Sequence, residues 1–125
     1  MCHRYGKKIW FFPDGEIPPE TEADTEEYHG HESLIILNPN RLGADIQITV
    51  YFPDKPPRKL NAGSVEAERV RCIRTNEPID GFNIPHGCQY ALKVEASEGV
   101  ICQLGRMDVS RANLAYYTTM GFTGC

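Results

Sequence analysis

The sequence predicts an all-β fold, a single-domain antiparallel β-sandwich with jelly-roll-like strand order. Apolar residues recur with a period of two, as in Ile46, Ile48 and Val50, which is typical of half-buried antiparallel strands. No window of about 11 residues carries the apolar stripe of an amphipathic helix. Nine prolines and eleven glycines are spread along the chain and mark frequent corners. Together these observations favour about seven or eight short strands.

The length of 125 residues predicts one domain, 1–125, with loose ends at 1–5 and 120–125. The first expected strand, Lys7–Phe12, ends at the corner Pro13-Asp14-Gly15. The next two are Glu32–Asn38 and Ala44–Phe52, and the second of these has the clearest alternation in the chain.

Four further strands are expected in the second half of the chain. They are Glu68–Arg74, Tyr90–Val94, Val100–Leu104 and Leu114–Thr119. The middle two flank Glu98-Gly99, where glycine tolerates positive φ, so they are expected to form a hairpin. Helix is expected only as one turn near 110–113, where Ser110 is a suitable N-cap.

The charge balance argues against a protein whose main task is to bind nucleic acid, although it leaves room for a local basic patch. Thirteen basic and seventeen acidic residues give a net charge of −4, whereas phosphate binding needs a cationic surface. Eight of the acids lie between Asp14 and Glu32, a stretch without Lys or Arg. The middle of the chain is basic, with Arg58, Lys59, Arg69, Arg71 and Arg74. Both regions are interpreted either as solvated faces or as complementary surfaces that meet between subunits.

We expect neither a secretory signal nor a membrane span, because no apolar run approaches the roughly 20 residues that a span requires. Its five cysteines are an odd number without a Cys-x-x-Cys pair. We interpret them as reduced thiols of a cytoplasmic protein, with Cys72 and Cys102 in the core and Cys2 and Cys125 in the loose ends.

The motifs of common active sites are missing. The pair His29 and His31 with Glu32 is a metal candidate, but the spacing fits a cupin-type site poorly, so no metal is expected. No nucleophile elbow, Walker motif or dinucleotide fingerprint is present. No cofactor is expected, and an enzyme is the less favoured class.

The most suggestive polar cluster is Gln103, Arg106, Asp108 and Arg111. Arg106 and Asp108 point the same way on an extended segment, so they can pair or share a ligand. An arginine fork holds a carboxylate, phosphate or sugar hydroxyl, and the alternative is a structural salt bridge.

Three aromatic residues allow two interpretations. Trp10, Tyr116 and Tyr117 suit either a sugar-stacking surface or, as the favoured interpretation, core and interface packing.

One tryptophan and six segments, in register along the chain, resemble the sensory rhodopsin transducer family. They are Trp10 with 15–19 (GEIPP), 31–38 (HESLIILN), 48–57 (ITVYFPDKPP), 65–71 (VEAERVR), 84–86 (IPH) and 103–108 (QLGRMD). The resemblance runs from about Gly6 to Thr119, whereas the acidic insert Thr21–Tyr28 departs from the family pattern.

The resemblance implies a homotetramer that binds a membrane photoreceptor and relays its signal without chemistry. It adds His31 and Glu32 to a candidate ligand-binding set completed by Gln103, Arg106 and Asp108. We expect a non-enzymatic binding and signalling module. A small-molecule or carbohydrate-binding protein is the alternative, and a sugar-modifying enzyme the third.

Overall fold

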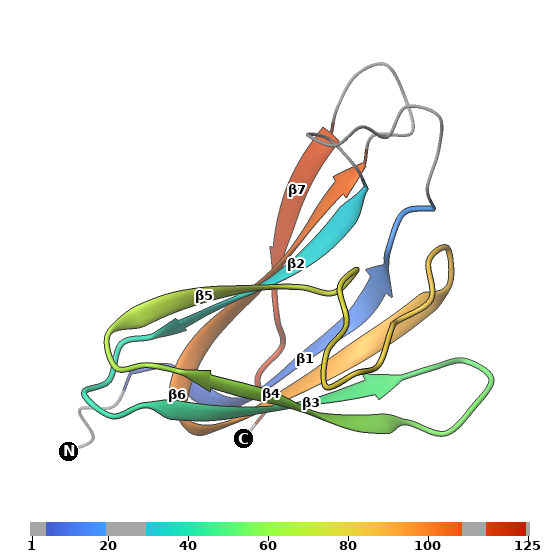
Figure 1. Ribbon diagram of the computed structural model, residues 1–125. Helices are drawn as coiled ribbons and strands as arrows, with labels where there is room; N and C mark the ends of the chain where they lie inside the picture. Colours follow the sequence, from blue (N-terminus) through green and yellow to red (C-terminus); the bar gives the residue numbers. More distant parts are fainter. Residues whose placement is uncertain (1–4, 20–29, 109–114, 125) are drawn as a thin grey trace.

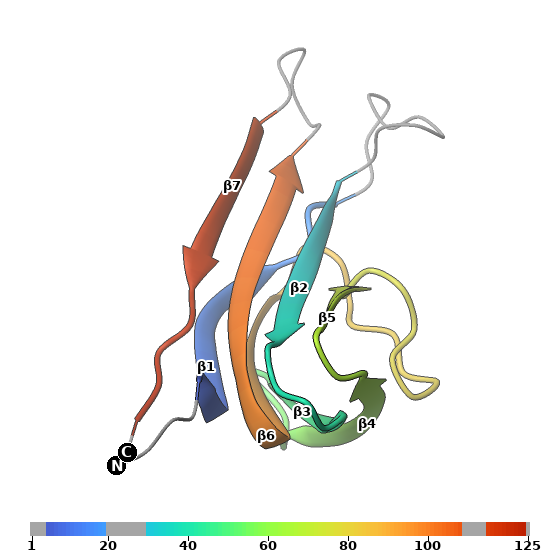
Figure 2. The same ribbon diagram turned by 90° about the vertical axis from the view of Figure 1, so that its left-hand side faces the viewer.

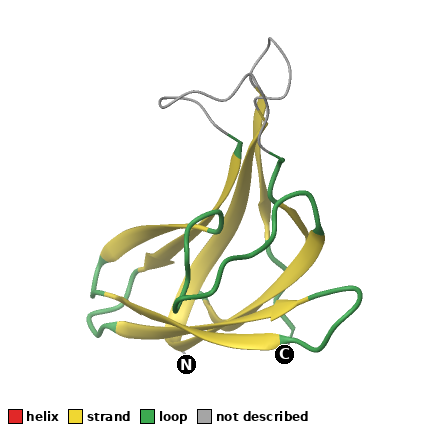
Figure 3. Ribbon diagram, turned by 45° about the vertical axis from the view of Figure 1, so that its right-hand side comes forward, coloured by secondary structure: helices red, strands yellow, loops and turns green. Residues whose placement is uncertain are grey.

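A computed structural model describes residues 5–19, 30–108 and 115–124 of the chain. Within these ranges the secondary structure consists of strands, with no helix (Figure 3). The strands, labelled in Figure 1, are β1 (Lys7–Glu16), β2 (His31–Asn38), β3 (Ala44–Tyr51), β4 (Arg58–Val65), β5 (Arg69–Arg74), β6 (Gln89–Asp108) and β7 (Ala115–Met120). The antiparallel all-β prediction is confirmed, while the jelly-roll-like order and the homotetramer stay predictions. The turn expected around Ser110 lies outside the described residues.

The strands form two antiparallel sheets that share β6. Sheet A has the order β4-β3-β6-β1, and sheet B has the order β5-β2-β6-β7. The first part of β6 pairs with β1 and β3, and its last part, from Ile101 on, pairs with β2 and β7. Figure 2 shows β6 bending between β7 and β2. The fold therefore has one strand on which both sheets are built.

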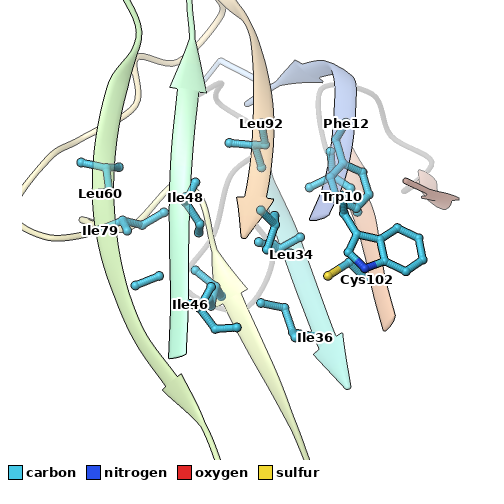
Figure 4. Packing of buried hydrophobic residues seen from close by; sticks show 14 of the residues in the cluster. Trp10, Phe12, Leu34, Ile36, Ile46, Ile48, Leu60, Ile79, Leu92 and Cys102 are labelled. Atoms are coloured by element: carbon cyan, nitrogen blue, oxygen red, sulfur yellow. The ribbon is translucent and has the colours of Figure 1, made fainter. Parts of the chain in front are cut away.

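The core lies between the two sheets. Alternating residues of each strand point inward, and Leu34, Ile36, Ile48 and Val94 are completely buried. Figure 4 shows side chains from both sheets pointing toward one another. Trp10 lies in this core with 7% of its surface exposed, and its indole N–H donates to the carbonyl of Val100 over 3.0 Å. Trp10 is therefore a packing residue, and its interpretation as part of a sugar-stacking surface is wrong.

The hairpin expected at Glu98-Gly99 is absent, because residues 89–108 are one continuous strand. Gly99 has a different role: a Cβ there would collide with the carbonyl oxygen of Tyr5. Position 99 requires glycine because two backbones approach closely there. In the sequence, such a glycine looks the same as a glycine in a turn.

Two further details of the strands differ from expectation. The corner expected at Pro13-Asp14-Gly15 is part of β1, which continues to Glu16 with a register shift between Phe12 and Gly15. The sequence analysis did not predict β4. The alternation of buried and exposed residues in this strand is interrupted at Gly63, which has a positive φ of 78°.

Two predictions about individual residues need correction. Cys102 is buried as expected, but Cys72 is exposed on β5, so its placement in the core is wrong. The C-terminal segment is tied to β1 rather than loose, because Phe11 and Phe122 exchange two backbone hydrogen bonds of 2.8 Å. Cys2 and Cys125 lie outside the described residues.

Candidate functional site

A buried ion pair joins β2 to β6 at the end of sheet B. Glu32 and Arg106 stand directly opposite each other in the strand register. Arg106 donates from Nε to Oε2 of Glu32 over 2.9 Å, and the two side chains are 19% and 1% exposed. A carboxylate removed from water this completely needs partners for both oxygens.

The second oxygen of the carboxylate is satisfied from sheet A. Tyr90, near the start of β6, donates its hydroxyl to Oε1 of Glu32 over 2.6 Å. The Tyr90 oxygen lies 3.0 Å from the Thr75 hydroxyl, and the Thr75 amide donates to the Glu32 carbonyl over 3.0 Å. The carboxylate is thus held by groups from both sheets.

Arg106 also reaches the edge strand β7. Tyr117 stands opposite Arg106 in the β6–β7 register and accepts a 2.7 Å hydrogen bond from Nη1 at its hydroxyl oxygen. The guanidinium carbon lies 5.6 Å from the centre of the Tyr117 ring, within the range of a cation–π contact. Glu32, Arg106 and Tyr117 form a polar row across three neighbouring strands.

The electrostatics of the row follow from burial and from the charge of Glu32. Burial alone lowers the pKa of Arg106, but its hydrogen bond to Glu32 and the negative charge of Glu32 outweigh burial and raise this pKa above its usual value. Burial, followed by the charge of Glu32, raises the pKa of Tyr90 far above its usual value. Tyr90 therefore remains a neutral donor, and Arg106 remains a cation, at physiological pH.

A cavity of about 250 Å³ opens beside this row. Its polar lining includes Asp14, Glu32, Arg106 and Tyr117. Its other lining residues are Phe12, Pro13, Leu104, Gly105, Thr119 and Met120. The cavity therefore lies among β1, β2, β6 and β7, with Arg106 in its wall.

The structure brings together only part of the predicted site. Glu32 and Arg106 meet, but side chains alternate along a strand, so His31 lies on the opposite face of β2 from Glu32. Gln103 is likewise on the opposite face of β6 from Arg106, opposite Ile35 in the register. His31 and Gln103 are not among the residues that line the cavity.

The predicted partner of Arg106 was Asp108, whereas the observed carboxylate partner is Glu32. Asp108 ends β6, opposite Ala115, and its side chain lies outside the description. Arg111 and His29 lie outside the described residues. The described part of the chain contains no group of three His, Cys, Asp or Glu side chains suited to a metal ion.

Sequence reasoning missed Tyr90, Thr75 and Asp14 as members of the site. Tyr90 belongs to the inward set of β6 with Leu92 and Val94, so its pattern predicts only a core residue. The hydroxyl of Tyr90 belongs to the site because it donates to Glu32, a residue 58 positions away in the chain. A local sequence pattern contains no information about such a distant partner. Tyr117 was noted only as an aromatic residue, and it is 53% exposed.

A second hollow, of about 680 Å³, lies on the outer face of sheet A. Its lining includes Asp45, Asn61 and Ser97, all exposed, together with the half-buried Glu95. These polar groups therefore have ready access to water.

The part of the chain that the structure describes includes no helix with the length and apolar character of a membrane span.

Comparisons with known proteins agree with this architecture. A crystal structure titled Thermotoga maritima 1070 is 31% identical, covers 94% of each chain and superposes with a TM-score of 0.83. The Anabaena sensory rhodopsin transducer is 28% identical, with a TM-score of 0.72, over 81% of this chain and 88% of that chain. A comparison with curated protein sequences gave no match.

The sequence profile of the family described as Anabaena sensory rhodopsin transducer matches residues 5–123. This match and the two structural neighbours confirm the resemblance noted in the sequence. The chain belongs to the Anabaena sensory rhodopsin transducer family.

Proposed function

We propose that this chain is a non-enzymatic binding and signal-relay module that acts as an assembly of its own copies. The family name associates its members with transduction from a rhodopsin. The observation that carries the proposal is the outer face of sheet B, where large apolar side chains face solvent. They are Leu37, Val70, Tyr116 and Met120, with exposures of 41%, 65%, 53% and 55%.

These residues share one face because of the strand register. Leu37 is opposite Val70 on β5 and Ile101 on β6, while Met120 and Tyr116 on β7 are opposite Gln103 and Met107. A face that runs across all four strands of a sheet is more extensive than the scattered apolar residues of ordinary surfaces. A second copy of the chain would cover it, and the family resemblance favours four copies.

The arrangement of the acid groups supports binding rather than catalysis. The Glu32 carboxylate is engaged by Tyr90 and Arg106, so neither oxygen is available as a general base in this conformation. The ionisable groups of the polar row hold one another in place.

Light scattering on the purified chain tests the assembly. We expect a mass several times 14.1 kDa for the wild type. Leu37→Glu places a charge on the outer face of sheet B and should give single chains. Ile9→Glu is the matched control, since Ile9 is 39% exposed but lies on β1 of sheet A. A monomeric wild type, or dissociation by Ile9→Glu alone, would contradict the proposal.

A second candidate function is small-molecule binding, and the cavity beside Arg106 favours it. At about 250 Å³ the cavity is smaller than the roughly 300–1,000 Å³ typical of drug-sized ligands. It would take only a small molecule. Arg106→Lys keeps the charge but loses the planar fork, so it should weaken such binding while the chain still folds.

A further inference from the structure

Five residues form a continuous row across the outer face of sheet A. In the strand register Lys59 on β4 stands opposite Thr49 on β3, and Thr49 stands opposite Lys93 on β6. Lys93 stands opposite Phe11 on β1, which forms a backbone bridge with Phe122. The neighbours of Thr49, Lys93 and Phe11 along their strands are buried in the core, so the row faces outward. It runs from a cationic end to an aromatic end.

The Thr49 hydroxyl lies at the cationic end and lacks a partner. Thr49 is only 4% exposed, although its side chain points away from the core. None of the described residues forms a hydrogen bond with its Oγ1 atom. A buried hydroxyl without a partner is unfavourable and therefore rare in native proteins. The hydroxyl can donate, as can the ammonium groups of Lys59 and Lys93, and an oxyanion is a group that accepts from all three.

The cationic end carries a surplus of one positive charge. Lys93 pairs with Glu95 over 3.4 Å, and both side chains remain in contact with water. Lys59 is exposed and forms no ion pair with any residue that the structure describes. Among the described residues that flank the row on the same face, Glu95 is the only carboxylate. The two lysines therefore favour an anionic ligand.

The other end of the row is apolar. Phe11 and Phe122 are 36% and 68% exposed, and Ile9, two residues before Phe11 on the same face, is 39% exposed. Two strand spacings of roughly 4.8 Å separate Thr49 from Phe11, a distance of about 10 Å. The large hollow on this face has none of the five residues of the row in its lining. Small molecules favour concave sites, so an open row of this length suits a protein segment better.

We propose that the row is a docking site for a partner segment that carries a carboxylate beside large apolar side chains. The carboxylate accepts from Lys59, Lys93 and the Thr49 hydroxyl, and the apolar side chains pack on Phe11 and Phe122. Two cations on a chain of net charge −4 suit one carboxylate better than the many phosphates of a nucleic acid. The inference goes beyond the proposed assembly, because it uses sheet A, whereas copies are proposed to meet on sheet B.

Acetylated and amidated pentapeptides serve as probes of the partner. The test peptide, Glu-Ser-Phe-Ser-Phe, presents its acidic and aromatic side chains on one side when extended, with about 7 Å between alternate residues. One control peptide has Gln in place of Glu, and the other has Ser in place of both Phe. Ligand-observed NMR with the full chain at low salt measures each dissociation constant. We expect the test peptide to bind at least about tenfold more tightly than either control, the equivalent of about 1.4 kcal/mol.

Variants of the row locate the binding. Thr49→Val keeps the branched shape and removes the hydroxyl, so it should weaken binding of the test peptide by about tenfold. It should not lower the resistance of the chain to urea, because it removes an unsatisfied polar group. Lys59→Gln should weaken binding by about threefold. Arg41→Gln removes an exposed cation from the turn between β2 and β3 and is the matched control, with unchanged affinity.

Five results would overturn the proposal. Either control peptide could bind as tightly as the test peptide, or no peptide could bind. A thymidine oligonucleotide that binds more tightly than the test peptide would identify a nucleic-acid surface instead. A loss of stability in Thr49→Val would assign the hydroxyl a structural role.

The fifth result separates this docking site from the assembly. A lower mass for Lys59→Gln in light scattering would show that a second copy covers the outer face of sheet A, and it would overturn the partner site. The assembly through sheet B is tested by Leu37→Glu, and peptide binding can be measured whether or not that variant dissociates. Failure of one proposal is therefore distinguishable from failure of the other.

Discussion

Glu32 and Arg106 lie 74 residues apart in the chain and only 2.9 Å apart in the fold. The pairing depends on the register of β2 against β6, which places the two residues opposite each other. A register slip of one residue would turn Arg106 toward the outer face of sheet B and leave Glu32 buried without its cation. The ion pair thus discriminates between the native register and its nearest alternatives.

Replacing Glu32 by Gln should destabilise the chain by about 3 kcal/mol. The amide has the shape of the carboxylate and can still accept from Tyr90, but its NH2 group would face the Arg106 donor. Removing one partner of a buried pair leaves the other charge uncompensated, although the partial exposure of Arg106 allows some relief. Urea denaturation of wild type and variant at pH 7 measures the difference.

Glu95→Gln is the matched control for this substitution. Glu95 pairs with Lys93 over 3.4 Å, but the side chains of Lys93 and Glu95 are 26% and 35% exposed, so water screens this pair far more than the Glu32 pair. Exposed pairs contribute about 0–1 kcal/mol, so this variant should unfold close to the wild type. Equal losses in the two variants would show that burial of the Glu32 carboxylate is not what makes its pair important.

Tyr90→Phe should cost about 1–3 kcal/mol, because it leaves one oxygen of the buried Glu32 carboxylate without its donor. The ring volume is unchanged, so no cavity contributes to the loss. In Glu32→Gln the same hydroxyl meets a neutral acceptor and should matter less. A double-mutant cycle by urea denaturation measures this coupling, and additive losses would contradict a direct Tyr90–Glu32 interaction.

Gly121→Ala should lower stability by about 1–3 kcal/mol through overpacking. A Cβ on Gly121 would lie 2.7 Å from Cζ of Phe12 and 3.0 Å from Cε3 of Trp10, and both rings are buried. In the control Gly124→Ala the nearest atom, on Phe122, is 3.8 Å from the new Cβ. Thermal melting compares the two variants. A neutral Gly121→Ala would mean that the C-terminal segment does not pack against this part of the core.

The buried thiol of Cys102 should make stability fall above about pH 9. Burial raises the pKa of Cys102 from 9.0 to about 12. Between these values the unfolded thiol ionises while the folded one stays protonated, so the unfolded state gains stability as the pH rises. The expected slope is about 1.4 kcal/mol per pH unit, and it disappears below the unfolded pKa.

Urea denaturation in reducing buffer between pH 8 and pH 10 measures this slope. Cys102→Ala should be less stable at every pH because it leaves a small cavity, but its stability curve should be flatter above pH 9. Parallel curves for wild type and variant would refute the assignment of the slope to this thiol.

Local patterns predicted most strands because apolar and polar residues alternate along a half-buried strand, and this alternation is visible in the sequence. Alternation placed Ile46, Ile48 and Val50 inward, and all three are buried. The same logic failed at β4, where the left-handed residue Gly63 breaks the alternation, and at Gly99, where a close backbone contact mimics a turn. A glycine in the sequence can mark a turn, a left-handed residue or a close backbone contact, and only the fold distinguishes among these causes.

The site was less predictable than the strands. Glu32 and Arg106 were both named as candidates, but nothing local indicates that they face each other. Gln103 was grouped with Arg106 by nearness in sequence, although three residues along a strand reverse the side-chain direction. Pairing across strands depends on register, and register is a property of the whole sheet.

The central position of β6 has a consequence for synthesis of the chain. In the part of the chain that the structure describes, five strands precede β6, and the backbone pairings among them are β3 with β4 and β2 with β5. On the ribosome these would be two separate two-stranded ribbons, which are marginally stable in water, while β1 would have no partner. A nascent chain that ends before Gln89 should therefore be susceptible to proteolysis. Protection should arise abruptly once β6 has left the exit tunnel and joins the two ribbons.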